Sequence, residues 1–174
     1  MRIRQVREDE LDALREIERA AGAPFRELGM HLVADGEPMS VAELDRFRRA
    51  GTAWVVTSED RPVGYLVAEP VDGELHIAQV SVHPDAARRG LGRELIEHAD
   101  RHAVAAGGFA GMSLTTYVEV PWNGPYYRRL GFTELPESRW GPGVRAIREA
   151  EAAAGLDLWS RAVMTRGLGC SAKV

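Results

Sequence analysis

The residues with the clearest chemical potential form the glycine- and arginine-rich stretch RRGLGR at 88–93. The residues around it predict that this stretch lies between a strand and a helix. The first turn of a helix has unpaired backbone N–H groups, and the helix dipole adds partial positive charge there. Glycines let the main chain approach an anion closely, and the arginines add cationic groups. The stretch therefore predicts a loop that binds a diphosphate, with a tight turn carrying surface arginines as the alternative.

The spacing of the residues excludes other binding motifs. The dinucleotide-binding motif GxGxxG is absent because Arg, Glu and Leu follow Gly92, and no GK(S/T) sequence of a Walker A loop is present. His98 and His102 have a spacing that can bind a metal, but no third ligand lies close in sequence, so we expect no metal.

The elements that must position this loop alternate along the chain. Three strands in hairpin succession and a later strand, interleaved with helices, predict an α/β (α+β) domain with a mixed sheet. The segment 22–39 is rich in glycine and proline, which predicts a long irregular loop of functional importance. The expected strands are 2–7, 53–57, 62–71, 75–82, 112–118 and 156–166, and the later helices are about 91–106, a short one ending at 131, and 142–154.

Two segments of this sequence resemble signatures of the GNAT N-acetyltransferase superfamily. VSVHPDAARRGLGRELI at 80–96 is similar to its acetyl-CoA-binding segment, in which a strand leads into the pattern Gln/Arg-x-x-Gly-x-Gly/Ala and then a helix. Ala87 stands where the family usually has Gln or Arg, which removes a side-chain contact but not the backbone loop. VPWNGPYYRRLGF at 120–132 is similar to the second signature, Tyr-x-x-x-Gly-Phe, which falls on Tyr127, Gly131 and Phe132.

The resemblance implies a GNAT-like fold. It is a mixed, mostly antiparallel central sheet with helices on both faces, splayed between the strands 75–82 and 112–118. We expect one domain over 1–167 and a loose tail over 168–174. In this family the pantetheine arm pairs with free backbone groups of a splayed strand, which implies Val80 and Val82 here. A backbone N–H at either position would also polarise the thioester carbonyl.

The resemblance also implies which residue protonates the leaving thiolate. A phenol has a pKa near 10, so Tyr127 is protonated at neutral pH and can act as the general acid. Tyr126, beside it, is expected to pack. Val120 occupies the place of the family's common Asn, so Asn123 is the substitute coenzyme contact, with capping of the following helix as its alternative role. The implied coenzyme-binding residues are Val80, Ser81, Val82, Arg88, Arg89, Gly90, Leu91, Gly92, Arg93, Asn123 and Tyr127.

The general base is less clearly marked. Family members often place Glu or Asp on the third hairpin strand, where this chain has Ala78 and Gln79. Glu119, just past the strand 112–118, is the substitute that we name, with a solvated carboxylate as its alternative role. His76, or a water molecule that relays the proton, would serve in place of Glu119.

The acceptor side is expected to comprise 22–39 and the loop 133–142. Phe25 and Trp122 are candidates for an apolar wall, and Arg26 for holding an anionic group, although each is equally consistent with packing or surface exposure.

Composition agrees with this interpretation. The chain has 174 residues with net charge −4, which does not indicate a nucleic-acid partner, and no apolar run long enough to span a membrane. The lone Cys170 fits a reducing cytoplasm. We therefore expect an acyltransferase that transfers acetyl from acetyl-CoA to a primary amine of a small molecule. A protein N-terminal or lysine acetyltransferase and a non-catalytic acyl-CoA sensor are the alternatives, and a homodimer is left open.

Overall fold

The structure, a computed structural model, describes residues 1–169. These residues form two compact units, one of Met1–Glu69 with Ala78–Ala99 and one of Pro70–Ile77 with the chain from Asp100 onward. We call them the first and the second unit, and each is described by itself. The expected single domain over 1–167 stays a prediction. Of the expected tail 168–174, only Leu168 and Gly169 are described, and Cys170 lies outside the described residues.

The strands form a seven-stranded sheet of order β1-β2-β3-β4-β5-β7-β6. The pairs β1–β2, β2–β3, β5–β7 and β6–β7 are antiparallel, and β4–β5 is parallel, which confirms the predicted mixed, mostly antiparallel sheet. The parallel ladder joins Leu75 with Met112 and His76 with Ser113. The strands are β1 (Arg2–Gln5), β2 (Ala53–Ser58), β3 (Arg61–Val71), β4 (Glu74–Val82), β5 (Gly111–Tyr117), β6 (Thr133–Glu134) and β7 (Arg161–Gly167).

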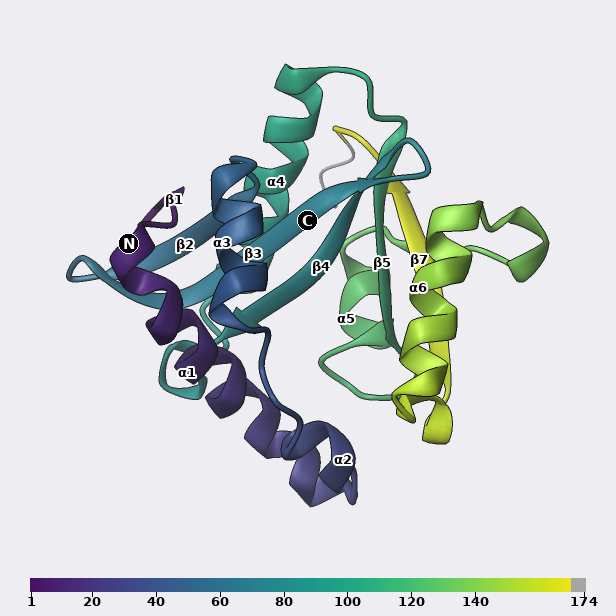
Figure 1. Cartoon of the computed structure of the whole chain (residues 1–174), viewed down its shortest axis with the longest axis horizontal. Helices are drawn as coiled ribbons and strands as arrows, with labels where there is room; N and C mark the ends of the chain where they lie inside the picture. The colour runs from purple at the N-terminus through teal and green to yellow at the C-terminus, as the bar shows by residue number, and fades with distance from the viewer. Residues whose placement is uncertain (170–174) are drawn as a thin grey trace. The chain divides into compact units, whose positions relative to one another are not determined.

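The first unit has helices on both faces of its strands (Figure 1). Alternation along β2 sends Val55 to one face and Trp54 to the other. Val55 joins a buried cluster with residues of α1 (Leu11–Gly22) and α3 (Val41–Arg49). Trp54 makes an edge-on ring contact with His98 of α4 (Leu91–Ala106), with ring centroids 5.6 Å apart. The cluster on the α1 and α3 face contains Val6, Leu11, Leu14, Ile17, Leu44, Phe47, Ala53, Val55, Tyr65 and Val67.

The second unit repeats this arrangement around β5. Thr115 hydrogen-bonds Glu151 of α6 (Pro142–Ala153). The next residue, Thr116, accepts a hydrogen bond from Asn123, which precedes α5 (Gly124–Arg129). Because successive strand residues point to opposite faces, α5 and α6 contact opposite faces of β5.

Two expected irregular segments contain regular structure. The segment 22–39 holds a 3-10 helix, Ala23–Leu28, and the short α2, His31–Ala34. Gly29, with φ of 73°, ends the 3-10 helix and separates the two, so the glycines mark boundaries rather than a continuous loop. The loop 133–142 likewise contains β6 and a 3-10 turn, Glu137–Arg139.

The last strand was expected too early. Residues Leu156–Leu158 form a 3-10 turn, and β7 begins only at Arg161. Gly155, with φ of 79°, redirects the chain after α6, and the apolar residues that follow it lie in that turn. Among residues 1–169, no helix combines the length and apolar character that crossing a bilayer would need.

Candidate functional site

The glycine loop leads directly into α4. Gly90 adopts φ of 78°, and its carbonyl accepts the first helical hydrogen bond, from the Glu94 N–H at 3.0 Å. Arg88 is also left-handed, with φ of 61°, a conformation that costs a non-glycine residue free energy. Such strain persists where the surrounding structure holds the backbone in place, and it often accompanies function.

The main-chain N–H groups of this loop find no acceptor in the described part of the chain. Within residues 1–169, the N–H groups from Arg88 to Gly92 donate no hydrogen bond. Gly90 is exposed, and a Cβ built on it would meet nothing within 4 Å. Together with the positive end of the α4 dipole, these donors form a site suited to an oxygen-rich anion.

The three arginines of the loop differ in their surroundings. The Arg93 Nε lies 2.7 Å from the Glu97 carboxylate one helical turn on. Arg88 and Arg89 are exposed, and Arg89 makes a long contact, 3.5 Å, to the Asp85 carbonyl. Arg88 and Arg89 are therefore the better placed cations for a phosphate, while Glu97 offsets the charge of Arg93.

The end of β4 next to this loop presents backbone groups on its outer edge. The His83 N–H donates to the Val63 carbonyl of β3 at 2.8 Å. The backbone N–H and C=O groups of successive residues point to opposite edges of a strand. Since those of His83 point toward β3, those of Val82 and Val80 point away from it. The Ser81 side chain is buried and accepts a hydrogen bond from Gln79 at 2.9 Å.

In the second unit, Tyr127 is held by the end of its own helix. Gly131, with φ of 87°, donates to the Arg128 carbonyl at 3.0 Å, and the Phe132 N–H donates to the Tyr127 carbonyl at 3.1 Å. This is the Schellman arrangement, in which the residue after the glycine contacts the residue five positions before it. The rings of Tyr127 and Phe132 meet edge-on, 5.9 Å apart. The spacing of Tyr, Gly and Phe in this motif thus fixes the tyrosine locally.

The Tyr127 side chain is suited to donate a proton. Burial raises the pKa of its hydroxyl above the ordinary 10, and neighbouring Tyr126 adds to the effect. Within residues 1–169 the hydroxyl makes no hydrogen bond. The group is therefore protonated at neutral pH and has no partner among the described residues.

Arg166 of β7 was missed by reasoning from the sequence. Its side chain is 3% exposed, its Nη1 donates to the Leu130 carbonyl at 2.9 Å, and its guanidinium lies 4.9 Å from the centre of the Phe132 ring. It also lies 3.7 Å from the Asp100 carboxylate. Arg166 therefore stabilises the chain at the end of α5. Reasoning from the sequence missed it because no local pattern marks a strand arginine as buried.

Gly124 was also missed. A Cβ at this position would lie 2.3 Å from the Val118 carbonyl oxygen, so only glycine lets α5 begin this close to the end of β5. Asn123 precedes the helix, but its side chain does not cap it and instead donates to Thr116 Oγ1 at 2.9 Å. The expected coenzyme contact by Asn123 thus has a competing partner inside the second unit.

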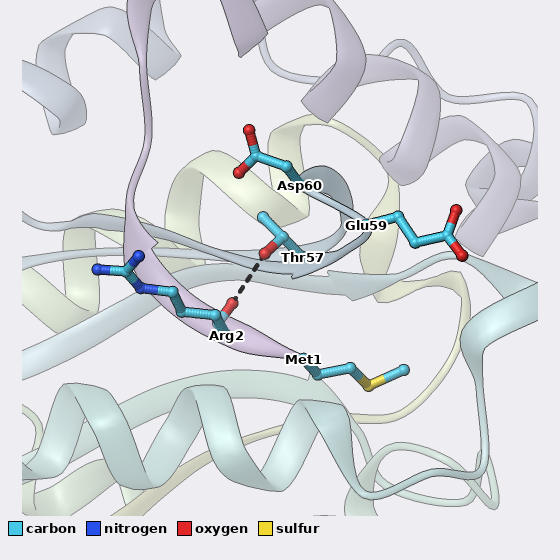
Figure 2. A pocket seen from close by; sticks show the side chains of 5 residues that line it. All are labelled: Met1, Arg2, Thr57, Glu59 and Asp60. Carbon is cyan, nitrogen blue, oxygen red and sulfur yellow. Dashed lines mark hydrogen bonds between the residues drawn. The ribbon is translucent and has the colours of Figure 1, made fainter.

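A separate hollow lies elsewhere in the first unit. It has a volume of about 250 Å³ and is lined by residues at the start of the chain and of β1, near the end of β2 and in the β2–β3 turn (Figure 2). There the Thr57 hydroxyl donates to the Arg2 carbonyl at 3.3 Å. None of the predicted site residues lines it. Its lining residues are Met1, Arg2, Thr57, Glu59 and Asp60.

Comparison with known proteins identifies the family. Residues 49–134 match the family model of the acetyltransferase (GNAT) domain, a range that includes both the glycine loop and Tyr127. The chain carries a GNAT acetyltransferase domain. The resemblance of the two sequence signatures to this superfamily is thereby confirmed.

Solved structures with the GNAT fold cover nearly the whole chain. The PaiA N-acetyltransferase of Thermoplasma acidophilum, in complex with coenzyme A, has a TM-score of 0.69 at 11% identity, covering 95% of this chain and 98% of its own. The ribosomal-protein-alanine N-acetyltransferase of Brucella melitensis has a TM-score of 0.65 at 17% identity, covering 97% and 100%. The N-acetylglutamate synthase of Neisseria gonorrhoeae, complexed with coenzyme A and N-acetyl-glutamate, has a TM-score of 0.68 at 19% identity, covering 96% of this chain and 35% of its own. At these identities the likeness shows the fold.

The candidate bases of this GNAT domain lie in contrasting surroundings. Glu119 is exposed just past the end of β5, and it has no ion pair or hydrogen bond within residues 1–169. His76 is 3% exposed, with its Nδ1 3.1 Å from the Ser113 hydroxyl at the last pair of the parallel ladder. Glu119 thus has the surroundings of a solvated carboxylate, and His76 those of a buried structural histidine.

The candidate acceptor residues lie in both units. Phe25 is partly buried in the 3-10 helix Ala23–Leu28 of the first unit, and Trp122 of the second unit is 43% exposed. Arg26 forms an ion pair with Asp35 across the α2 turn. An anionic acceptor group would therefore have to compete with Asp35 for the Arg26 guanidinium.

Proposed function

We propose that this GNAT domain transfers the acetyl group of acetyl-CoA to a primary amine of a small molecule, by direct attack in a ternary complex. The observation that carries the proposal is the row of N–H groups from Arg88 to Gly92, which donate to no acceptor within residues 1–169 at the positive end of α4. A diphosphate satisfies such donors and brings the charge that the helix end favours.

The first unit binds the coenzyme in this proposal. Arg88 and Arg89 add charge to the diphosphate contact, and the outward backbone groups of Val80 and Val82 pair with the pantetheine arm. An N–H on this edge of β4 would also stabilise the oxyanion that forms as the amine attacks.

The second unit supplies the acid. Tyr127 gives its hydroxyl proton to the coenzyme thiolate as the carbon–sulfur bond breaks, because its pKa is raised by burial and lies above that of a thiol. The helix-end contacts through Gly131 and Phe132 support this role, since a general acid must hold a fixed position.

The acceptor is the less constrained part of the proposal. Phe25 and Trp122 are proposed as apolar contacts and Arg26 as a contact for an anionic group. A protein N-terminus or lysine is the alternative acceptor, and the names of the structural neighbours include both a ribosomal-protein-alanine N-acetyltransferase and an N-acetylglutamate synthase.

One observation favours a second candidate, a GNAT domain that binds an acyl-CoA without turnover. β4 carries Ala78 and Gln79 where family members often hold a carboxylate, and the substitute Glu119 is exposed. A sensor would keep the diphosphate loop and need no base.

A panel of amines separates these candidates. Purified protein is incubated with acetyl-CoA and amino acids, polyamines, arylalkylamines or short peptides, and free thiol is measured. Amine-dependent release supports the transferase, and tight acetyl-CoA binding without release supports the sensor. Equal thermal protection by ATP and acetyl-CoA would refute both and indicate a general nucleotide site.

We place this reaction in the cytoplasm, because a chain with a single cysteine forms no internal disulfide and so suits a reducing compartment. Whether two copies associate is tested by light scattering of the purified protein.

A further inference from the structure

A partly buried carboxylate on α1 is not used by the proposed mechanism. The Glu18 Oε2 accepts a hydrogen bond from the Tyr65 hydroxyl of β3 at 2.5 Å and one from the Met39 N–H at 3.3 Å. Tyr65 is fully buried, so this contact lies at the edge of the core of the first unit.

The second carboxylate oxygen, Oε1, accepts no hydrogen bond within residues 1–169. The Glu18 residue is partly exposed to solvent. Glu18 therefore has one oxygen anchored by the protein and one available to a ligand, which suits a carboxylate that binds a donor such as an ammonium group.

The charges facing Glu18 come from two elements, α1 and α3. Arg15 lies on the same helix, with its Nε bound to the Met39 carbonyl at 3.0 Å, and Glu43 lies on α3. Burial raises the pKa of Glu18, and the repulsion from Glu43 adds to this, while the bonds from Tyr65 and Met39 and the charge of Arg15 lower it. The net direction is upward, which moves the group toward the range in which a base works near neutral pH.

Glu18 lies beside residues of the proposed acceptor side. Met39 ends the segment 22–39, and Met39 and Ala78 both pack against the core cluster that contains Tyr65. Ala78 is one of the two β4 positions at which family members often have a carboxylate. The small Ala78 side chain and the Glu18 carboxylate thus belong to one face of the first unit, the face covered by α1 and α3.

We propose that Glu18 binds the acceptor amine through its free oxygen and takes up the amine's proton before attack. This inference rests on the proposed function. An ammonium ion gives one proton to the Glu18 carboxylate, leaving a neutral amine and a carboxylic acid. The amine nitrogen then bonds to the acetyl carbon, the carbon–sulfur bond breaks, and Tyr127 protonates the thiolate. The positively charged nitrogen of the product gives its second proton to the Tyr127 phenolate, which leaves a neutral amide and a protonated tyrosine. Glu18 afterwards releases its proton to solvent. Glu18 replaces Glu119 in the role that the sequence indicated for a substitute base.

The first test is Glu18→Gln, with Glu16→Gln as the matched control. The glutamine carbonyl can still accept from Tyr65 and Met39, so the fold is retained while the charge is lost. Glu16 is on the same helix, is exposed and pairs only with Arg19 within residues 1–169. With the best amine of the panel, we expect kcat/KM of Glu18→Gln to fall about 100-fold, as for the loss of a general base. We also expect the pH profile of kcat/KM to lose its acid limb, the fall in activity at low pH that reports protonation of Glu18. Glu16→Gln should match the wild type.

The second test is Tyr65→Phe, which keeps the carboxylate and removes the donor that lowers its pKa. The acid limb of kcat/KM should then move to higher pH, with activity approaching that of the wild type above the limb. A purely structural role would lower the melting temperature without moving the limb.

The failures are distinguishable. An active wild type with an unchanged profile in Glu18→Gln overturns this inference alone. An absence of amine-dependent thiol release from the wild type overturns the proposed function and this inference with it. Acetyl-CoA binding by Glu18→Gln, measured by calorimetry, should stay within about twofold of the wild type, and its loss would assign Glu18 a structural role instead.

Discussion

Replacing Gly90 by glutamate tests the diphosphate loop most directly. The position is exposed, left-handed and open, so a side chain has room there but places its charge among the loop's free N–H groups. We expect the variant to fold and to lose acetyl-CoA affinity, because a carboxylate would occupy or repel the site of the diphosphate.

The magnitude follows from two separable costs. A non-glycine residue at φ of 78° costs about 1–2 kcal/mol of folding stability. A unit charge about 5 Å from one phosphate charge, at an effective dielectric constant of about 20, costs roughly 3 kcal/mol of binding free energy. At about 1.4 kcal/mol per tenfold, the dissociation constant should rise by roughly 100-fold or more. Added salt should narrow the difference, because this repulsion is exposed to solvent.

Two matched variants separate backbone strain from charge. Gly90→Ala carries the strain without the charge and should bind acetyl-CoA within about threefold of the wild type, given the open space around its Cβ. Gly107→Glu carries the same strain and charge, at φ of 72° with equally open surroundings near the end of α4. It should bind like the wild type. Affinities for coenzyme A and acetyl-CoA are measured by calorimetry, and folding by thermal melts.

Unchanged acetyl-CoA affinity in Gly90→Glu would refute the assignment of the loop. Equal losses in Gly90→Glu and Gly90→Ala would show that backbone strain, rather than charge at the diphosphate, produces the effect.

Three further predictions concern the second unit and the carboxylate of α1. Tyr127→Phe should lower kcat by about 100-fold with little change in acetyl-CoA affinity, as for a lost general acid, and equal rates in a thiol-release assay would remove that role. Arg166→Met should lower the free energy of unfolding by about 3–5 kcal/mol in urea titrations, because Asp100 and the Leu130 carbonyl lose a buried charged partner. A loss under about 1 kcal/mol would contradict a stabilising role of Arg166 at the end of α5. Glu18→Gln should be more stable than the wild type at neutral pH and as stable as the wild type in acid. The folded state raises the pKa of the Glu18 carboxyl, so the folded wild-type protein loses stability as the pH rises through that pKa, whereas the uncharged glutamine does not titrate. Free energies of unfolding from urea titrations that differ between the two proteins by the same amount at every pH would contradict this.

Local patterns predicted most of the elements correctly. Ser40 and Glu43 have the spacing of a capping box and form one at the start of α3, with the Ser40 Oγ accepting from the Glu43 N–H at 3.2 Å. The strand after the Asp72–Gly73 turn and the helix after Gly90 begin within about one residue of their predicted starts. These signals act over a few residues, so a single sequence contains them.

The predictions of secondary structure were wrong where the same local pattern is compatible with two kinds of element. The glycines and prolines of 22–39 predicted a loop, but the residues between them form short helical turns. The apolar residues after Gly155 have the composition of a strand, yet they lie in a 3-10 turn before β7. Propensity alone does not choose between such solutions, because packing against the rest of the chain outweighs it.

The sequence by itself determined the order of the elements, the glycine loop before α4 and the motif that holds Tyr127, since each depends on neighbouring residues and on the backbone conformations that glycine permits. Only the tertiary structure decided the surroundings of Arg166, Gly124 and Glu18. The Arg166 guanidinium is bound by a carbonyl 36 residues away, and the Glu18 carboxylate by a hydroxyl 47 residues away. Burial and pKa depend on such distant contacts, because desolvation is a property of everything that surrounds a group in space.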